Sequence, residues 1–142
     1  MAENMGIDQK LFDYIMHSIQ ETPFYQLLGL QVKKLGLGTA ELEIISRTQH
    51  TNPLGVVHGG LYMSILDAAM GNAVRSLSIK AVTVDLSTGF VASAALGDTL
   101  IASGEVIRSG KSMLFARAQV TSGDRLVADA RGTFYRIGSI DL

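Results

Sequence analysis

The residues of this 142-residue chain that are best suited to chemistry lie in one stretch, from Asn52 through the pair Gly59 and Gly60 to Asp67. The two glycines let the backbone approach a ligand closely. If a helix begins at this pair, its first N–H groups have no acceptor within the helix and carry partial positive charge. Such groups can stabilise the oxyanion that forms when a carbonyl is attacked. The same glycines also suit the tight start of a buried helix, so alone they are a weak indication.

Asp67 is the side chain in this stretch that most needs an explanation. Residues 61–77 are apolar on almost every side, which predicts a buried central helix. An unpaired carboxylate inside such a helix costs on the order of several kcal/mol. A carboxylate that is kept there is therefore paired or used, for example as a general base.

The spacing between Gly59 and Asp67 also bears on assembly. Eight residues separate them, or about 12 Å along a helix axis at about 1.5 Å per residue. At that distance Asp67 cannot act on a carbonyl held at the N-terminus of its own helix. A second helix packed antiparallel would bring Asp67 of one subunit near Gly59 of the other, twice by symmetry. If both features serve one site, we expect a homodimer with shared active sites.

Three further polar residues are candidates, each with an ordinary structural alternative. Thr83, in a strand segment beside Val82 and Val84, could position a water next to Asp67 or be a plain strand threonine. Asn52 could hold a carbonyl or a water, although an asparagine before a proline commonly makes a turn. His58 could bind substrate or support its loop, and a lone loop histidine is more often structural.

Composition limits the protein class. Hydrophobic residues make up 47% of the chain and charged residues 18%, with a formal net charge of −1, so no basic field is present to hold nucleic acid. No apolar run is long enough to span a membrane, and the N-terminus has no signal pattern. The chain has no cysteine, and the spacing of its histidines does not suit a metal, so we expect no metal site and a soluble cytoplasmic protein.

The elements that would position these residues can be read from the hydrophobic pattern. Asp8 caps a helix to about Gln20, within an N-terminal helical extension covering residues 1–22, and a short helical turn ends at Gly29. Residues 30–35 and 39–47 form a hairpin, and four more strands follow the central helix. In the first of these, strict alternation places Val82, Val84 and Leu86 on one face and Thr83, Asp85 and Ser87 on the other. The order predicts a single α+β domain over residues 1–142, with a curved antiparallel sheet wrapped around one long central helix.

The composite pattern resembles a known family. Asn52, Gly55, His58, Gly59 and Gly60, followed by Asp67 nine residues after the histidine, are similar to the PaaI-type acyl-CoA thioesterases of the hotdog fold. The likeness runs from about Leu28 to Phe134 and includes the strand around Thr83, Phe90 with the Gly97–Asp98 turn, and residues 108–111. It implies the hotdog fold, a homodimer that can pair into a dimer-of-dimers tetramer, and no cofactor.

The resemblance also implies roles for single residues. Asp67 would activate water or attack the thioester directly, the Gly59 N–H would polarise the thioester carbonyl, and Asn52, His58 and Thr83 would lie around the thioester. The implied reaction hydrolyses an acyl- or aryl-CoA to a free acid and CoA. We expect the substrate to be bound by Gly60, Met63, Met70, Arg108, Gly110, Lys111 and Ser112, the last four near the nucleotide of CoA, although residues 108–112 could equally be a solvated turn.

Two other functions fit a hotdog domain. A non-catalytic module could sense or carry acyl-CoA, but it would need no carboxylate at the thioester. A hydratase or dehydratase would need a histidine and an acid on the central helix, and residues 61–77 contain no histidine. The sequence therefore favours the thioesterase.

Overall fold

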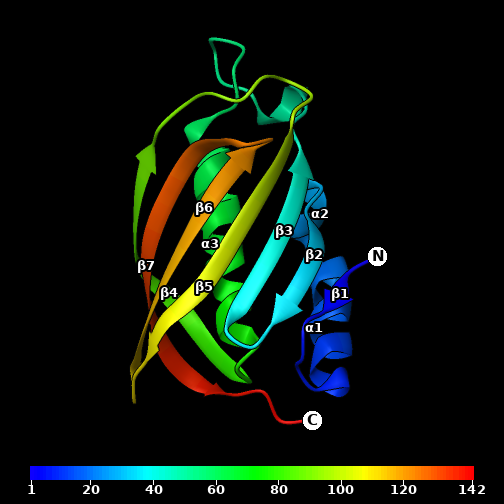
Figure 1. Cartoon of the computed structure of the whole chain (residues 1–142), viewed down its shortest axis with the longest axis vertical. Helices are drawn as coiled ribbons and strands as arrows, with labels where there is room; N and C mark the ends of the chain where they lie inside the picture. Colours follow the sequence, from blue (N-terminus) through cyan, green and yellow to red (C-terminus); the bar gives the residue numbers. More distant parts are fainter.

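The computed structural model describes all 142 residues and contains one seven-stranded sheet that curves around a long helix (Figure 1). The chain begins with β1 (Glu3–Asn4), α1 (Gln9–Glu21), α2 (Pro23–Leu28), β2 (Gln31–Gly36) and β3 (Thr39–Ile45). A 3-10 turn, η1 (Thr48–His50), and a loop lead to the central helix α3 (Gly59–Arg75). The remaining strands are β4 (Ile79–Phe90), β5 (Thr99–Ser109), β6 (Met113–Ser122) and β7 (Arg125–Ser139). The predicted α+β architecture is confirmed.

The order of the strands leaves one long edge of the sheet without a partner strand. The strands lie in the order β1-β2-β3-β5-β6-β7-β4, and all neighbours are antiparallel except β1 and β2. The two-residue β1, which the sequence did not predict, covers the edge at β2. At the other edge, β4 is 12 residues long and pairs only with β7.

The core lies between α3 and the inner face of the sheet, and one glycine determines how closely they approach. A Cβ atom at Gly104 of β5 would lie 2.6 Å from the carbonyl carbon and oxygen of Ala69 in α3. The backbones of the helix and the strand therefore touch directly at this point. Because backbone atoms cannot rotate away, Gly104 fixes the depth at which α3 sits in the sheet.

The N-terminal helices pack against the C-terminal half of α3. Asp8 caps α1 as predicted, accepting hydrogen bonds from the backbone N–H groups of Lys10 and Leu11. Arg75, in the last turn of α3, donates to the Ser18 hydroxyl of α1 at 2.6 Å and to the Asn72 side-chain oxygen at 2.9 Å. Burial lowers the pKa of the Arg75 guanidinium below its usual range. These contacts hold α1 against the helix that carries Asp67.

The strict alternation predicted for β4 is wrong. Thr83 pairs with Phe134 and Asp85 pairs with Thr133, so Val84 is an extra residue in a β-bulge. Beyond the bulge the faces are exchanged: Leu86, opposite Gly132, lies on the inner face together with Thr83 instead of sharing the face of Val82. An inserted residue reverses the two-residue period, which a single sequence does not reveal.

Candidate active site

The N-terminus of α3 presents one free backbone donor. His58 caps the helix, and its Nδ1 accepts a hydrogen bond from the Gly60 N–H at 2.7 Å. The Leu61 N–H donates to the His58 carbonyl, and the His58 N–H donates to the His50 carbonyl. The Gly59 N–H, between these satisfied groups, has no hydrogen-bond partner. It is therefore available to an external oxygen at the positive end of the helix dipole.

Asn52 shapes the loop that precedes this donor. Its side-chain oxygen accepts hydrogen bonds from the N–H groups of Leu54 at 2.9 Å and Val56 at 3.3 Å, so the turn interpretation holds for the oxygen. The side-chain NH2 of Asn52 makes no hydrogen bond. The same residue can therefore brace the loop with its oxygen and still offer a donor to a ligand.

Asp67 and Thr83 meet across the space between α3 and β4. The Thr83 hydroxyl donates to Asp67 Oδ1 at 2.7 Å, and both side chains have exposed surface. Oδ2 of Asp67 has no partner in the chain. The pairing depends on the β4 bulge, which lies directly after Thr83, and bulges commonly re-aim side chains next to active sites.

One side of α3 is open in the single chain. Its residues with exposed surface follow the three- and four-residue spacing of one helix face: Gly59, Gly60, Met63, Ser64, Asp67, Gly71 and Arg75. Met63 is 39% exposed, whereas Met70 is fully buried in the core, where a Cβ atom at Gly132 would meet its sulfur. Of the two methionines expected to bind substrate, only Met63 therefore reaches the surface in the single chain.

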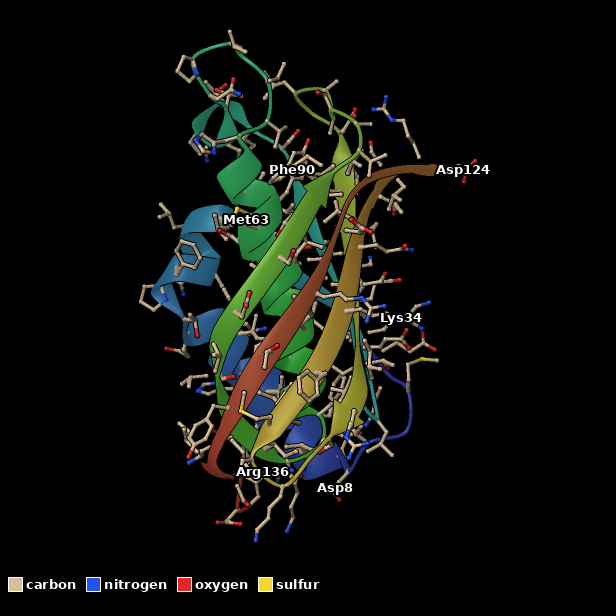
Figure 2. The ribbon with its side chains drawn as sticks, turned by 90° about the vertical axis from the view of Figure 1, so that its left-hand side faces the viewer. Asp8, Lys34, Met63, Phe90, Asp124 and Arg136 are labelled. Carbon is tan, nitrogen blue, oxygen red and sulfur yellow. The ribbon has the colours of Figure 1, made fainter.

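Phe90 flanks the Gly59 end of the open side. Its ring lies 3.4 Å from the position of a Cβ atom at Gly59 and stacks at a tilt on Tyr62, with ring centroids 6.2 Å apart. Figure 2 shows Met63 and Phe90 toward the end of the molecule where α3 begins, and Arg136 at the opposite end. Phe90 was not predicted as a site residue, because strict alternation along β4 would place it on the face of Val82.

The turn that joins β5 to β6 lies at the far end of the molecule from the start of α3 (Figure 1). Arg136 holds this turn from β7, donating to the Ser109 hydroxyl at 3.1 Å and to the Gly110 carbonyl at 3.2 Å. Arg108 and Lys111 are exposed and form no ion pair. Within one chain, residues 108–112 therefore do not join the cluster around Gly59.

The predicted catalytic residues thus form two half-sites, one around the start of α3 and one beside Asp67, further along the same helix. The first contains Asn52, His58, Gly59 and Gly60, and the second contains Asp67 and Thr83. Between Gly59 and Asp67 lie two turns of α3, or about 12 Å. One half-site offers hydrogen-bond donors for a developing oxyanion, and the other offers a carboxylate with a free oxygen. Together they have the groups that hydrolysis of an activated carbonyl requires.

Comparison with known proteins decides the family. Residues 54–128, just over half of the chain, match the thioesterase superfamily. The chain belongs to the thioesterase superfamily. Within it, this protein is a PaaI-type thioesterase with the hotdog fold, and it is a thioester hydrolase.

Individual relatives agree with this assignment. The acyl-coenzyme A thioesterase PaaI of Escherichia coli is 30% identical over 78% of this chain and 80% of its own. The human acyl-coenzyme A thioesterase 13 is 25% identical over 90% of this chain and 95% of its own. Both relatives match along most of their length.

Solved structures show the same fold. The structure of the E. coli PaaI protein from the phenylacetic acid degradation operon superposes with a TM-score of 0.88 at 24% identity, covering 94% of this chain and 98% of that one. A Streptococcus mutans protein solved with acetyl-CoA superposes with a TM-score of 0.76 at 25% identity, covering 79% and 91%. The predicted hotdog fold is therefore confirmed.

No three His, Asp or Glu side chains come together in a group that could hold a metal ion. None of the helices has the length and apolar character that a membrane crossing needs.

Proposed function

We propose that this thioesterase hydrolyses acyl-CoA or aryl-CoA thioesters at sites formed between two copies of the chain. The observation that carries the proposal is the pair of half-sites on α3: a free Gly59 N–H at the helix N-terminus and a Thr83-bound carboxylate at Asp67. Neither half-site is complete alone. The names of the relatives and the acetyl-CoA found with one structural neighbour support a CoA thioester as substrate.

Two features support the shared site. The edge of β4 leaves backbone N–H and C=O groups without a partner strand, and a second β4 can satisfy them. The open side of α3 carries the small residues Gly60, Ser64 and Gly71, and a Cβ atom at Gly71 would meet nothing within 4 Å. Two such helices can approach closely in antiparallel orientation, which brings Asp67 of one subunit to Gly59 of the other.

The proposed reaction proceeds by attack of water. Oδ2 of Asp67 accepts a proton from a water whose oxygen attacks the thioester carbonyl carbon, while Thr83 holds Oδ1. Negative charge on the carbonyl oxygen is stabilised by the Gly59 N–H of the other subunit, with the Asn52 NH2 and His58 placed beside the thioester. The carbon–sulfur bond then breaks and CoA leaves as the thiolate. A general base of this kind supplies about 10²–10⁴-fold and an oxyanion donor about 10²–10³-fold.

The phosphates of CoA are assigned to the β5–β6 turn. Arg108 and Lys111 carry charges that no carboxylate of the chain neutralises. The Gly110 N–H is bonded to the Met113 carbonyl, but the N–H groups of Lys111 and Ser112 have no backbone acceptor and can reach a phosphate oxygen. Arg136 stiffens the turn through Ser109 and Gly110. A preformed turn loses less entropy on binding, which favours its use as a phosphate site.

Two such dimers are proposed to pair through the outer face of the sheet into a tetramer. A depression of about 680 Å³ on this face is lined by three basic and three acidic side chains: Lys34, Arg117, Arg131, Glu41, Glu105 and Asp129. Figure 2 shows Lys34 on this side of the sheet. Arg131 lies opposite Arg117 in the strand register and forms no ion pair within the chain. Because this face carries equal numbers of positive and negative charges, the same face of a second copy can supply a carboxylate to Arg131. Light scattering should give a tetramer for the wild type and dimers for Arg131→Glu.

The experiment that tests the function measures free thiol released from an acyl-CoA panel. The panel contains aryl-acetyl-CoA, benzoyl-CoA and straight-chain acyl-CoA thioesters, each incubated with wild type and with Asp67→Ala. Asp124→Asn, at the exposed β6–β7 turn, is the control for loss of one carboxylate. We expect rapid release of thiol from some thioesters by the wild type and the control, and almost none by Asp67→Ala.

Two results of the thiol-release assay would contradict the proposal. If no thioester releases thiol while acyl-CoA raises the melting temperature of the protein, the chain binds acyl-CoA without cleaving it. Full activity of Asp67→Ala would refute the role of Asp67.

A further inference from the structure

His50 is a buried histidine directly beneath the loop that carries the candidate oxyanion donor. It ends η1 and is only 5% exposed. The chain leaves His50, forms the loop of residues 51–57, and returns to His58. A two-residue bridge between Thr51 and Val57 closes the base of this loop.

The contacts of His50 connect both ends of this loop. The ring Nδ1 of His50 accepts a hydrogen bond from the Arg47 backbone N–H at 2.9 Å. The backbone N–H of His50 donates to the Arg47 carbonyl at 2.8 Å. Its carbonyl accepts from the His58 N–H at 2.8 Å. His50 therefore holds the backbone of His58, which leads directly into Gly59, in a fixed position.

The bond from His58 to His50 has a direct consequence for Gly59. The His58 N–H and the Gly59 N–H belong to consecutive peptide planes, so the dihedral angles of His58 set the direction of the Gly59 N–H. Those angles are φ −67° and ψ 139°. If the His50 carbonyl moves, the Gly59 N–H turns away from its present direction.

We propose that His50 is a positioning residue for the hydrolysis, which holds the 51–57 loop and the start of α3 so that the Gly59 N–H points at the thioester oxygen. This inference rests on the proposed function of Gly59. His50 touches no reacting atom; it acts through the His58 and Gly59 backbone.

The role requires His50 to be neutral. A protonated ring would have N–H groups at both nitrogens, and Nδ1 could no longer accept from the Arg47 N–H. The one charged side chain that faces the ring is Arg47, α2 contributes only the backbone of Leu28, and no carboxylate is present to stabilise an imidazolium. Burial lowers the pKa of His50 below 6.5; the Leu28 backbone opposes this effect and the Arg47 charge adds to it.

Two substitutions separate positioning from mere support of the fold. His50→Leu keeps the approximate bulk but removes the acceptor, leaving the Arg47 N–H unsatisfied. His50→Asn keeps an oxygen acceptor that does not titrate. His17→Asn, at an exposed histidine of α1, is the matched control. Each is assayed by steady-state hydrolysis from pH 5 to pH 8, after its melting curve has shown that it is folded.

We expect His50→Leu to lower kcat about 10–100-fold with KM changed less than about twofold, because the donor is misplaced relative to the transition state. His50→Asn should recover much of kcat and flatten the decline of kcat at acid pH. If His50→Leu does not fold, the acid side of the His50→Asn profile decides: a flatter decline supports the proposal, and an unchanged decline overturns it.

The proposal is overturned if folded His50→Leu keeps the kcat of His17→Asn. Failure of the proposed function itself would look different, because the wild type would then release no thiol at any pH.

Discussion

The Thr83 hydroxyl donates a 2.7 Å hydrogen bond to Oδ1 of Asp67, and no group of the chain donates to Oδ2 of the same carboxylate. The two oxygens are therefore unequal. One is held by the edge strand β4, and the other is free to accept a proton from water. The hydrogen bond from Thr83 fixes the plane of the Asp67 carboxylate, which could otherwise rotate about its terminal side-chain bond.

Thr83→Val tests this orientation, since it keeps the shape of the side chain and removes the hydroxyl. A single hydrogen bond to a charged group contributes about 1.5–3 kcal/mol. Thr83→Val removes this bond from the enzyme–substrate complex as well as from the transition state, and only the difference lowers kcat. We therefore expect kcat to fall about tenfold. Thr83→Ser should recover most of kcat. Equal kcat values for all three proteins, measured by thiol release at saturating substrate, would remove Thr83 from the mechanism.

Gly59→Pro deletes the proposed oxyanion donor with little cost to the helix. Proline suits the first position of a helix, and the preceding His58 already has the extended conformation that a following proline requires. A Cβ atom there would be 3.4 Å from Phe90, an ordinary contact. We expect kcat to fall about 10²–10³-fold with an unchanged melting temperature. A melting temperature that falls together with kcat would indicate damage to the fold.

Gly104 and Gly132 form a matched pair for stability, because a Cβ atom at each would press on α3. At Gly104 it would meet the Ala69 and Met70 backbone at 2.6–2.8 Å, whereas at Gly132 its nearest neighbour is the end of the flexible Met70 side chain at 3.0 Å. Gly104→Ala should destabilise by about 2–3 kcal/mol or more, and Gly132→Ala by less than about 1.5 kcal/mol. Urea denaturation of both variants measures the difference, and equal losses would contradict the backbone contact.

The lowered pKa of His50 predicts an acid-sensitive stability. The folded state resists protonation of His50, so below about pH 6.5 the unfolded chain binds more protons than the folded one. The stabilising contribution is therefore complete above that pH and is lost as the pH falls through the lower folded pKa. The free energy of unfolding should decrease from pH 7.5 to pH 5 more steeply in the wild type than in His50→Asn. Parallel slopes would show that His50 is not the group responsible.

Much of the fold followed from the sequence because its hydrophobic patterns are long. The apolar run at 61–77 predicted α3, which begins at Gly59, and alternation with turn residues predicted the four strands that follow it. The Asp8 cap of α1 was also predicted. The spacing of Gly59 and Asp67 on one helix already separated the two half-sites, while the roles of their residues remain predictions.

The sequence failed where a single residue or a distant contact decides the geometry. The extra Val84 in β4 carries no signature, yet it brings Leu86 to the face of Thr83. It also allows Phe90 to pack against Gly59. His50 resembled any loop histidine, because its importance comes from a buried ring and a carbonyl bonded to His58.

The measurement that tests the shared site most directly uses two inactive proteins. Asp67→Asn and Gly59→Pro chains with different affinity tags, both also carrying Arg131→Glu so that the protein stays dimeric, are coexpressed, and the hybrid dimer is purified through both tags. One of its sites combines the intact Asp67 of the Gly59→Pro subunit with the intact Gly59 of the Asp67→Asn subunit, and the other site has neither group. We predict that each hybrid dimer recovers about half of the wild-type kcat. A hybrid as inactive as its two parents would contradict a site built from Asp67 of one subunit and Gly59 of the other.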